Sequence, residues 1–124
     1  MDLSLDRPEG YRFVRRVGEH GITLIDRDLT DSFLLAPDRA VEHWPVHDAG
    51  ALGAEHVEDL LALQPELVLL GTGARQVFPP AAFMAGVLRK GIGVEAMDNA
   101  AAARTYNLLA SEGRRVVAGF VLPG

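Results

Sequence analysis

The sequence predicts an α/β fold in a single domain, with a β-α-β-α-β C-terminal half and additional antiparallel β-hairpins in its N-terminal half. Two observations lead to this prediction. The C-terminal half alternates unbroken apolar runs with helical patterns, a β-α-β-α-β order typical of parallel strands with helices packed over them. The N-terminal half consists of short β-prone runs separated by turn residues, as antiparallel hairpins do. We expect residues 1–124 to form one domain, with an ordered core at about residues 11–122.

The N-terminal strands are predicted where β-prone residues run between turn signals. Gly18-Glu19-His20-Gly21 and Pro37-Asp38 are such signals, because glycine, proline and aspartate favour turn conformations. The four predicted strands are Tyr11–Val17, Gly21–Asp26, Ser32–Ala36 and Ala40–Trp44.

The C-terminal half contains three predicted helices and three predicted strands. The helices are Ala54–Leu63, Pro80–Lys90 and a third that starts at Asp98 or Asn99 and runs to about Glu112. The strands are Leu67–Leu70, Gly93–Met97 and Arg114–Leu122, all in one sheet, with the first two parallel. Gly113 is expected to end the third helix in a left-handed conformation, with Thr105 and Leu108 facing inward.

The composition excludes several functional classes. Seventeen acidic against twelve basic residues give a net charge of -5, which disfavours binding to nucleic acid. The absence of cysteine removes thiol catalysis, disulfides and thiolate metal sites. Met1–Gly10 mixes acids with a base and a proline, unlike a signal peptide, and no apolar run reaches the ~18 residues of a membrane span. We therefore expect a cytoplasmic protein without a cofactor.

The junction Gly71-Thr72-Gly73-Ala74-Arg75 is the first candidate site. Its glycines free the backbone to turn N–H groups toward a ligand, and Arg75 offers a bidentate clamp for a phosphate or carboxylate. A lone Gly-x-Gly is a weak signal, however. The favoured interpretation is a tight turn in which Arg75 pairs with a nearby carboxylate.

Glu95 and Asp98 form the second candidate site, at the end of the next strand along the sheet. Ligands of open α/β sheets gather beyond the carboxyl ends of strands, so the two carboxylates and Arg75 could form an acid–base site. The alternative, which we favour, is that Asp98 caps its helix and Glu95 pairs with Arg75 or Arg104.

Thr105-Tyr106-Asn107 places polar side chains inside the third helix. Asn107 could reach a loop backbone and the Tyr106 hydroxyl could end at the cleft, but structural hydrogen bonding is favoured over catalysis. His43 and His47 are four residues apart with Pro45 between them, so they do not form a zinc-binding helical turn, and no metal site is predicted.

Several motifs together resemble a known family. They are Leu70-Gly71-Thr72-Gly73, Phe78-Pro79, Gly93-Val94-Glu95-Ala96-Met97-Asp98, Thr105-Tyr106-Asn107-Leu108-Leu109 and Glu112-Gly113-Arg114. This pattern is similar to the domain-of-unknown-function family that includes mitochondrial respiratory complex I assembly factor 3 and the adipogenesis-associated domain-containing protein. The resemblance implies a three-layer α/β domain with a mixed central sheet, flanked on one side by additional β structure from the N-terminal half. It also implies an assembly or regulatory role. Asn99 departs from the pattern, which has a small hydroxyl residue after the aspartate.

Two functions follow as hypotheses. The first is a protein-interaction or assembly-factor-type domain with a protein partner, which exposed apolar surface near Trp44, Val46 or Phe78 would favour. The alternative is a small-molecule or anion-binding protein, or an enzyme, with its cleft at Gly71–Arg75 and Glu95–Asp98. Because no nucleophile and no metal-ligand set can be named, a non-catalytic role is favoured.

Overall fold

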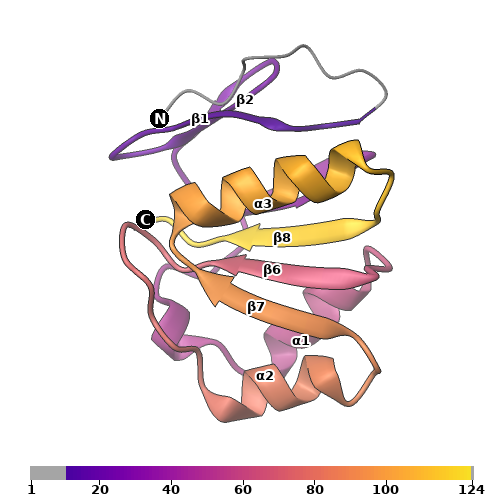
Figure 1. Cartoon of the computed structure of the whole chain (residues 1–124). Helices are drawn as coiled ribbons and strands as arrows, with labels where there is room; N and C mark the ends of the chain where they lie inside the picture. Colours follow the sequence, from indigo (N-terminus) through magenta and orange to yellow (C-terminus); the bar gives the residue numbers. More distant parts are fainter. Residues whose placement is uncertain (1–10, 124) are drawn as a thin grey trace.

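The computed structural model describes residues 11–123, which form two β-sheets with a helix between them (Figure 1). The smaller sheet is antiparallel and consists of β1 (Val14–Val17), β2 (Ile22–Leu24) and β3 (Asp28–Leu29). The larger sheet contains β4 (Phe33–Ala36), β5 (Arg39–Glu42), β6 (Leu67–Gly71), β7 (Gly93–Met97) and β8 (Val116–Phe120), in the order β5-β4-β8-β6-β7. The helices are α1 (Ala54–Leu61), α2 (Ala81–Leu88) and α3 (Asn99–Ser111), with a short 3-10 turn at Ala49–Ala51.

The larger sheet is mixed, as predicted. Strand β6 is parallel to both β7 and β8, whereas β4 is antiparallel to β8 and to β5. The three predicted C-terminal strands therefore do lie in one sheet. The hairpin β4–β5 joins this sheet, so that within residues 11–123 the additional β structure consists of β1, β2 and β3. Strand β3 was not predicted. Because all four residues of β4 are buried, this strand needs neighbours on both sides and cover on both faces.

The layers follow from the two faces of the larger sheet. Helix α3 packs between the two sheets, and α1 and α2 cover the opposite face (Figure 1). The core on the α3 side includes Tyr106 and Phe33, and the core on the other side includes Trp44, Leu60 and Phe83.

Local capping signals fixed the ends of α3 correctly. The Asp98 Oδ1 atom accepts a hydrogen bond from the Ala101 N–H at 2.8 Å, and Gly113 has φ +78°, the predicted left-handed stop. The other two helices are shorter than predicted. Helix α1 ends at Leu61, and α2 begins after Pro80 and ends at Leu88.

The predicted inward face of α3 is partly wrong. Leu108 is 59% exposed, and Thr105 is half-buried with its hydroxyl 3.7 Å from the Met97 sulfur. Because α3 packs against a sheet on either side, the face of the helix that is buried lies next to the predicted face. The buried side chains on that face are Ala102, Ala103, Tyr106 and Ala110.

Candidate functional site

The two predicted junctions meet at the carboxyl ends of the parallel strands. Gly71 at the end of β6 pairs with Met97 at the end of β7. Beyond the strands, the Thr72 N–H donates to the Met97 carbonyl at 2.9 Å, and the Asn99 N–H donates to the Gly73 carbonyl at 2.8 Å. The two loops are therefore bound directly to each other.

Asn99 is the central residue of this junction. Its side chain is buried, with Oδ1 accepting from the Gly73 N–H at 3.2 Å and Nδ2 donating to the Val121 carbonyl at 3.0 Å. Gly71 makes room for it, because a Cβ at Gly71 would overlap the Asn99 Oδ1 atom. Sequence reasoning considered Asn99 only as a helix cap. The available signal in the sequence was that Asn99 stands where the family pattern has a small hydroxyl residue.

The Thr72 hydroxyl organises the loop that follows β6. Its oxygen accepts from the Val77 N–H at 3.0 Å and lies 2.7 Å from the Arg75 carbonyl and 3.2 Å from the Met97 carbonyl. Gln76 extends over β7, where its Nε2 donates to the Ala96 carbonyl at 2.9 Å. The loop is thus held at both ends by hydrogen bonds.

These bonds occupy the groups that an anion site would use. The N–H groups of Thr72 and Gly73 donate hydrogen bonds to protein oxygens, so they are not available to a ligand. Arg75 is exposed and, among residues 11–123, forms no ion pair with Glu95 or Asp98, contrary to the favoured interpretation. Its carbonyl, rather than its guanidinium, turns inward to Thr72, and an ion pair at so exposed a position stabilises little.

Tyr106 and Asn107 lie away from this junction. The Tyr106 hydroxyl donates to the Arg12 carbonyl at 2.8 Å, and Asn107 bonds the Val14 N–H at 2.9 Å and the Val14 carbonyl at 2.8 Å. Both residues attach the smaller sheet to α3. Burial raises the pKa of Tyr106 well above its usual value, so the hydroxyl stays protonated and suited to donate.

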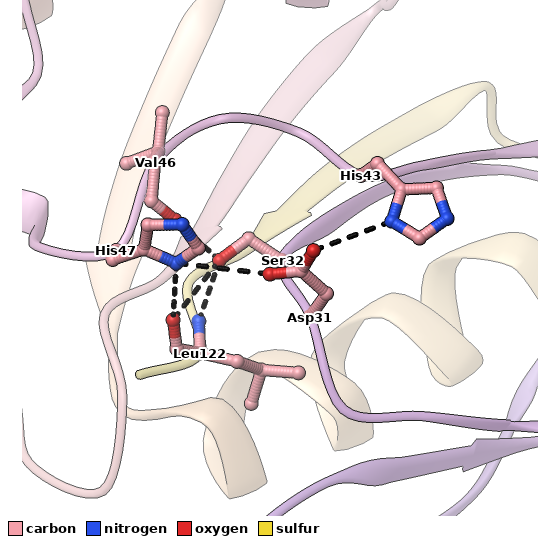
Figure 2. Close-up of polar contacts among 6 residues, drawn as sticks. All are labelled: Asp31, Ser32, His43, Val46, His47 and Leu122. Carbon is pink, nitrogen blue, oxygen red and sulfur yellow. Dashed lines mark hydrogen bonds and ion pairs between the residues drawn. The ribbon is translucent and has the colours of Figure 1, made fainter. Parts of the chain in front are cut away.

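A second polar cluster contains Asp31, Ser32, His43 and His47 (Figure 2). The Asp31 carboxylate lies between His43 Nδ1 at 3.3 Å and His47 Nδ1 at 3.7 Å. The buried Ser32 hydroxyl accepts from the Leu122 N–H at 2.8 Å. It donates to a backbone carbonyl rather than to a histidine, so this is no nucleophile site. The cluster holds the chain after β8 against the segment before β4.

Residues 11–123 contain neither a metal-binding cluster of side chains nor a membrane-spanning helix. No group of three histidine, aspartate or glutamate side chains is arranged to hold a metal ion. No helix in the same range is both long and apolar enough to cross a membrane. Met1–Gly10, on which part of the cytoplasmic expectation depended, lies outside the described residues, so that location stays a prediction.

Exposed apolar surface lies near Trp44, where Val41 is 40% exposed in a cavity that both residues line, and at Phe78. Trp44 and Val46 are buried, but Phe78 is 84% exposed and the neighbouring Val77 is 37% exposed. Three cavities lie elsewhere, and none of them is lined by the predicted site residues. One of them, about 430 Å³, lies at the opposite end of β8, where Arg114 and Arg115 are paired with acidic residues.

Similar proteins are known at the level of both structure and sequence. The NMR structure of a Xanthomonas campestris protein has a TM-score of 0.83 and 47% identity, covering 100% of this chain and 94% of that one. The "13 kDa major membrane protein" of Francisella tularensis subsp. holarctica is 31% identical over 106 residues, 85% of this chain and 79% of that protein. The "NADH dehydrogenase [ubiquinone] 1 alpha subcomplex assembly factor 3" of Danio rerio is 33% identical over 86 residues, 68% of this chain and 49% of that protein.

The family model described as "Protein of unknown function (DUF498/DUF598)" matches residues 14–121. This range includes every motif on which the resemblance was based, and the assembly factor 3 relative confirms it. The chain belongs to the DUF498/DUF598 family.

Proposed function

We propose that this chain is a protein-interaction domain of the assembly-factor type, with the loop that carries Phe78 as a contact point for its partner. The observation that carries the proposal is the 84% exposure of Phe78 on a loop fixed by hydrogen bonds. A single exposed apolar side chain is ordinary by itself. An aromatic side chain on a fixed backbone is better suited to binding than other exposed apolar side chains, because binding then costs little conformational entropy.

The backbone around Phe78 is restricted on both sides. The Val77 N–H is bound to the Thr72 hydroxyl, and Pro79, which is buried, and Pro80 limit the chain that follows. Aromatic side chains are enriched among the residues that dominate binding energy at protein interfaces. The Danio rerio relative, named as an assembly factor, supports the same class of function.

Anion binding or catalysis at the junction has less support. The backbone donors of Thr72 and Gly73 are already bound, and Asp98 is engaged in capping α3. Arg75 and Glu95 are exposed, and neither lines any of the three cavities that could enclose a substrate. A protein partner needs no such enclosure.

The test is affinity capture from extracts of the source organism with the tagged chain. Phe78→Ser is compared with wild type and with Leu108→Ser, a control that removes an exposed apolar side chain from α3 instead. We expect wild type and Leu108→Ser to retain the same proteins and Phe78→Ser to lose them. Melting temperatures should confirm that both variants fold. Equal capture by Phe78→Ser, or no capture by wild type above a tag-only control, would contradict the proposal.

A further inference from the structure

The outer edge of β5 has unpaired peptide groups. Ala36 and Arg39 flank the two-residue turn between β4 and β5, so they form the hydrogen-bonded pair that closes the hairpin. Bonded and non-bonded pairs alternate along an antiparallel ladder. The N–H and carbonyl groups of Ala40 and Glu42 therefore point away from β4, and within residues 11–123 no other group bonds them.

A groove of about 390 Å³ runs beside this edge, between β5 and α1. It exists because α1 packs against β8 and α2 against β7, which leaves the β4–β5 end of the same face open. The apolar side chains that line it include Leu34, Val41, Trp44, Pro45 and Leu63. Val41 is 40% exposed, although it lies on the same sheet face as the buried Leu34.

Trp44 gives the groove a rigid floor. Its Nε1 donates to the Asp59 carboxylate of α1 at 3.1 Å, and its ring packs so closely on Gly119 of β8 that a Cβ there would lie 3.0 Å away. The buried indole thus joins the sheet to the helix. A preformed groove of this kind keeps its shape without an occupant.

We infer that an extended segment of a partner protein adds to β5 as a further strand of the larger sheet and places alternate side chains in this groove; the inference rests on the proposed function. Only an extended backbone offers acceptors and donors spaced to match Ala40 and Glu42. Side chains of such a strand alternate, so one set would cover Val41 and Trp44. Arg39 lines the groove without an ion-pair partner among residues 11–123, which calls for an acidic side chain opposite it.

The other edge of the sheet is less suited to strand addition. In β7 the Met97 carbonyl faces β6, so the peptide groups of Val94 and Ala96 face outward. The Gln76 side chain already donates a hydrogen bond to the Ala96 carbonyl. Val94 and Ala96 line none of the three cavities. It therefore provides a matched internal control.

The experiment selects linear nine-residue peptides from a phage-displayed library against the full chain. We expect the selected peptides to alternate apolar and polar residues and to carry an acidic residue. Binding of a synthetic copy should slow hydrogen exchange at the Ala40 and Glu42 amides, measured by NMR, and leave the amides of Val94 and Ala96 unchanged. This measurement uses only the wild-type protein, so its outcome does not depend on whether a variant folds.

Two proline variants then separate the edges. Ala40→Pro and Ala96→Pro each remove one outward N–H, which an edge strand tolerates. Loss of one backbone hydrogen bond should weaken peptide binding about tenfold in Ala40→Pro alone. Peptides without alternation, exchange protection at Ala96 instead of Ala40, or equal binding by folded Ala40→Pro would overturn the inference.

Phe78→Ser distinguishes this result from the proposed function. Phe78 does not line the groove, so the variant should bind the selected peptide with unchanged affinity. Failure of the peptide experiment while capture remains dependent on Phe78 would refute the groove alone. Peptide binding at Ala40, with no protein captured through Phe78, would refute only the role of the loop.

Discussion

Replacing Gly71 by alanine tests whether the junction depends on the buried Asn99 side chain. The new Cβ would overlap Asn99 Oδ1 and lie 2.9 Å from a ring carbon of Phe120, and both side chains are buried. Asn99 would have to move away and release the Gly73 N–H and the Val121 carbonyl. Overpacking costs about 1–3 kcal/mol and each lost hydrogen bond about 1 kcal/mol, so we expect a loss of about 4 kcal/mol in unfolding free energy.

The assay is urea unfolding, followed by the fluorescence of Trp44, the single tryptophan, and by far-UV circular dichroism. Gly93→Ala is the control, because a Cβ there meets only the Leu67 side chain, at 3.2 Å; it should change stability by less than about 0.5 kcal/mol. In an Asn99→Ala background the Gly71→Ala change should cost only about 1 kcal/mol, since the overlapping atom is gone. The reasoning is refuted if Gly71→Ala is as stable as wild type, or costs the same with and without Asn99.

Three further predictions concern other parts of the fold. Asn107→Ala should lose about 2 kcal/mol and speed hydrogen exchange at the Val14 amide, because it removes two hydrogen bonds between α3 and β1; unchanged exchange would contradict this. Gly113→Val should cost about 1–2 kcal/mol from its left-handed backbone alone, since no atom lies within 4 Å of an added Cβ, and a melting temperature equal to wild type would contradict it. The hydrogen bond from Arg115 lowers the pKa of Asp38 below its usual 3.8, so its small contribution is present above about pH 4 and lost as the pH falls through the lowered value. Asp38→Asn should be slightly less stable than wild type at pH 7, and this difference should shrink as the pH is lowered below about 4 in parallel urea titrations.

Local patterns predicted most of the secondary structure. Apolar runs identified β6, β7 and β8, and the two ends of α3 followed from Asp98 and Gly113, because a helix cap depends on residues within a few positions. The pairing of β4 with β8 did not follow. Hairpin strands can pair with either sheet, and only the full burial of β4 shows which sheet it joins.

The two predicted junctions do meet at one edge of the sheet, but the contacts made there were not predicted. Parallel strands place their carboxyl ends at one edge, so the order of elements alone predicted that Gly71–Arg75 and Glu95–Asp98 would meet. The pairing expected for Arg75 is absent among the described residues, and Tyr106 turned out to face the smaller sheet. Exposure of Arg75 and of Phe78 depends on how the loop folds back through Gln76, which no spacing in the sequence encodes.

By itself, the sequence determined the three helices, the three C-terminal strands, their order and the family, because periodicity, caps and motifs are local properties of the chain. The tertiary structure decided the partners of the buried polar side chains. Asn99 bonds a glycine 26 residues earlier, and Asn107 bonds a backbone 93 residues earlier. A buried polar group takes whichever donor or acceptor the packed chain brings to it, since leaving it unpaired costs more than the bond itself contributes. Such partners are therefore set only when distant segments pack together.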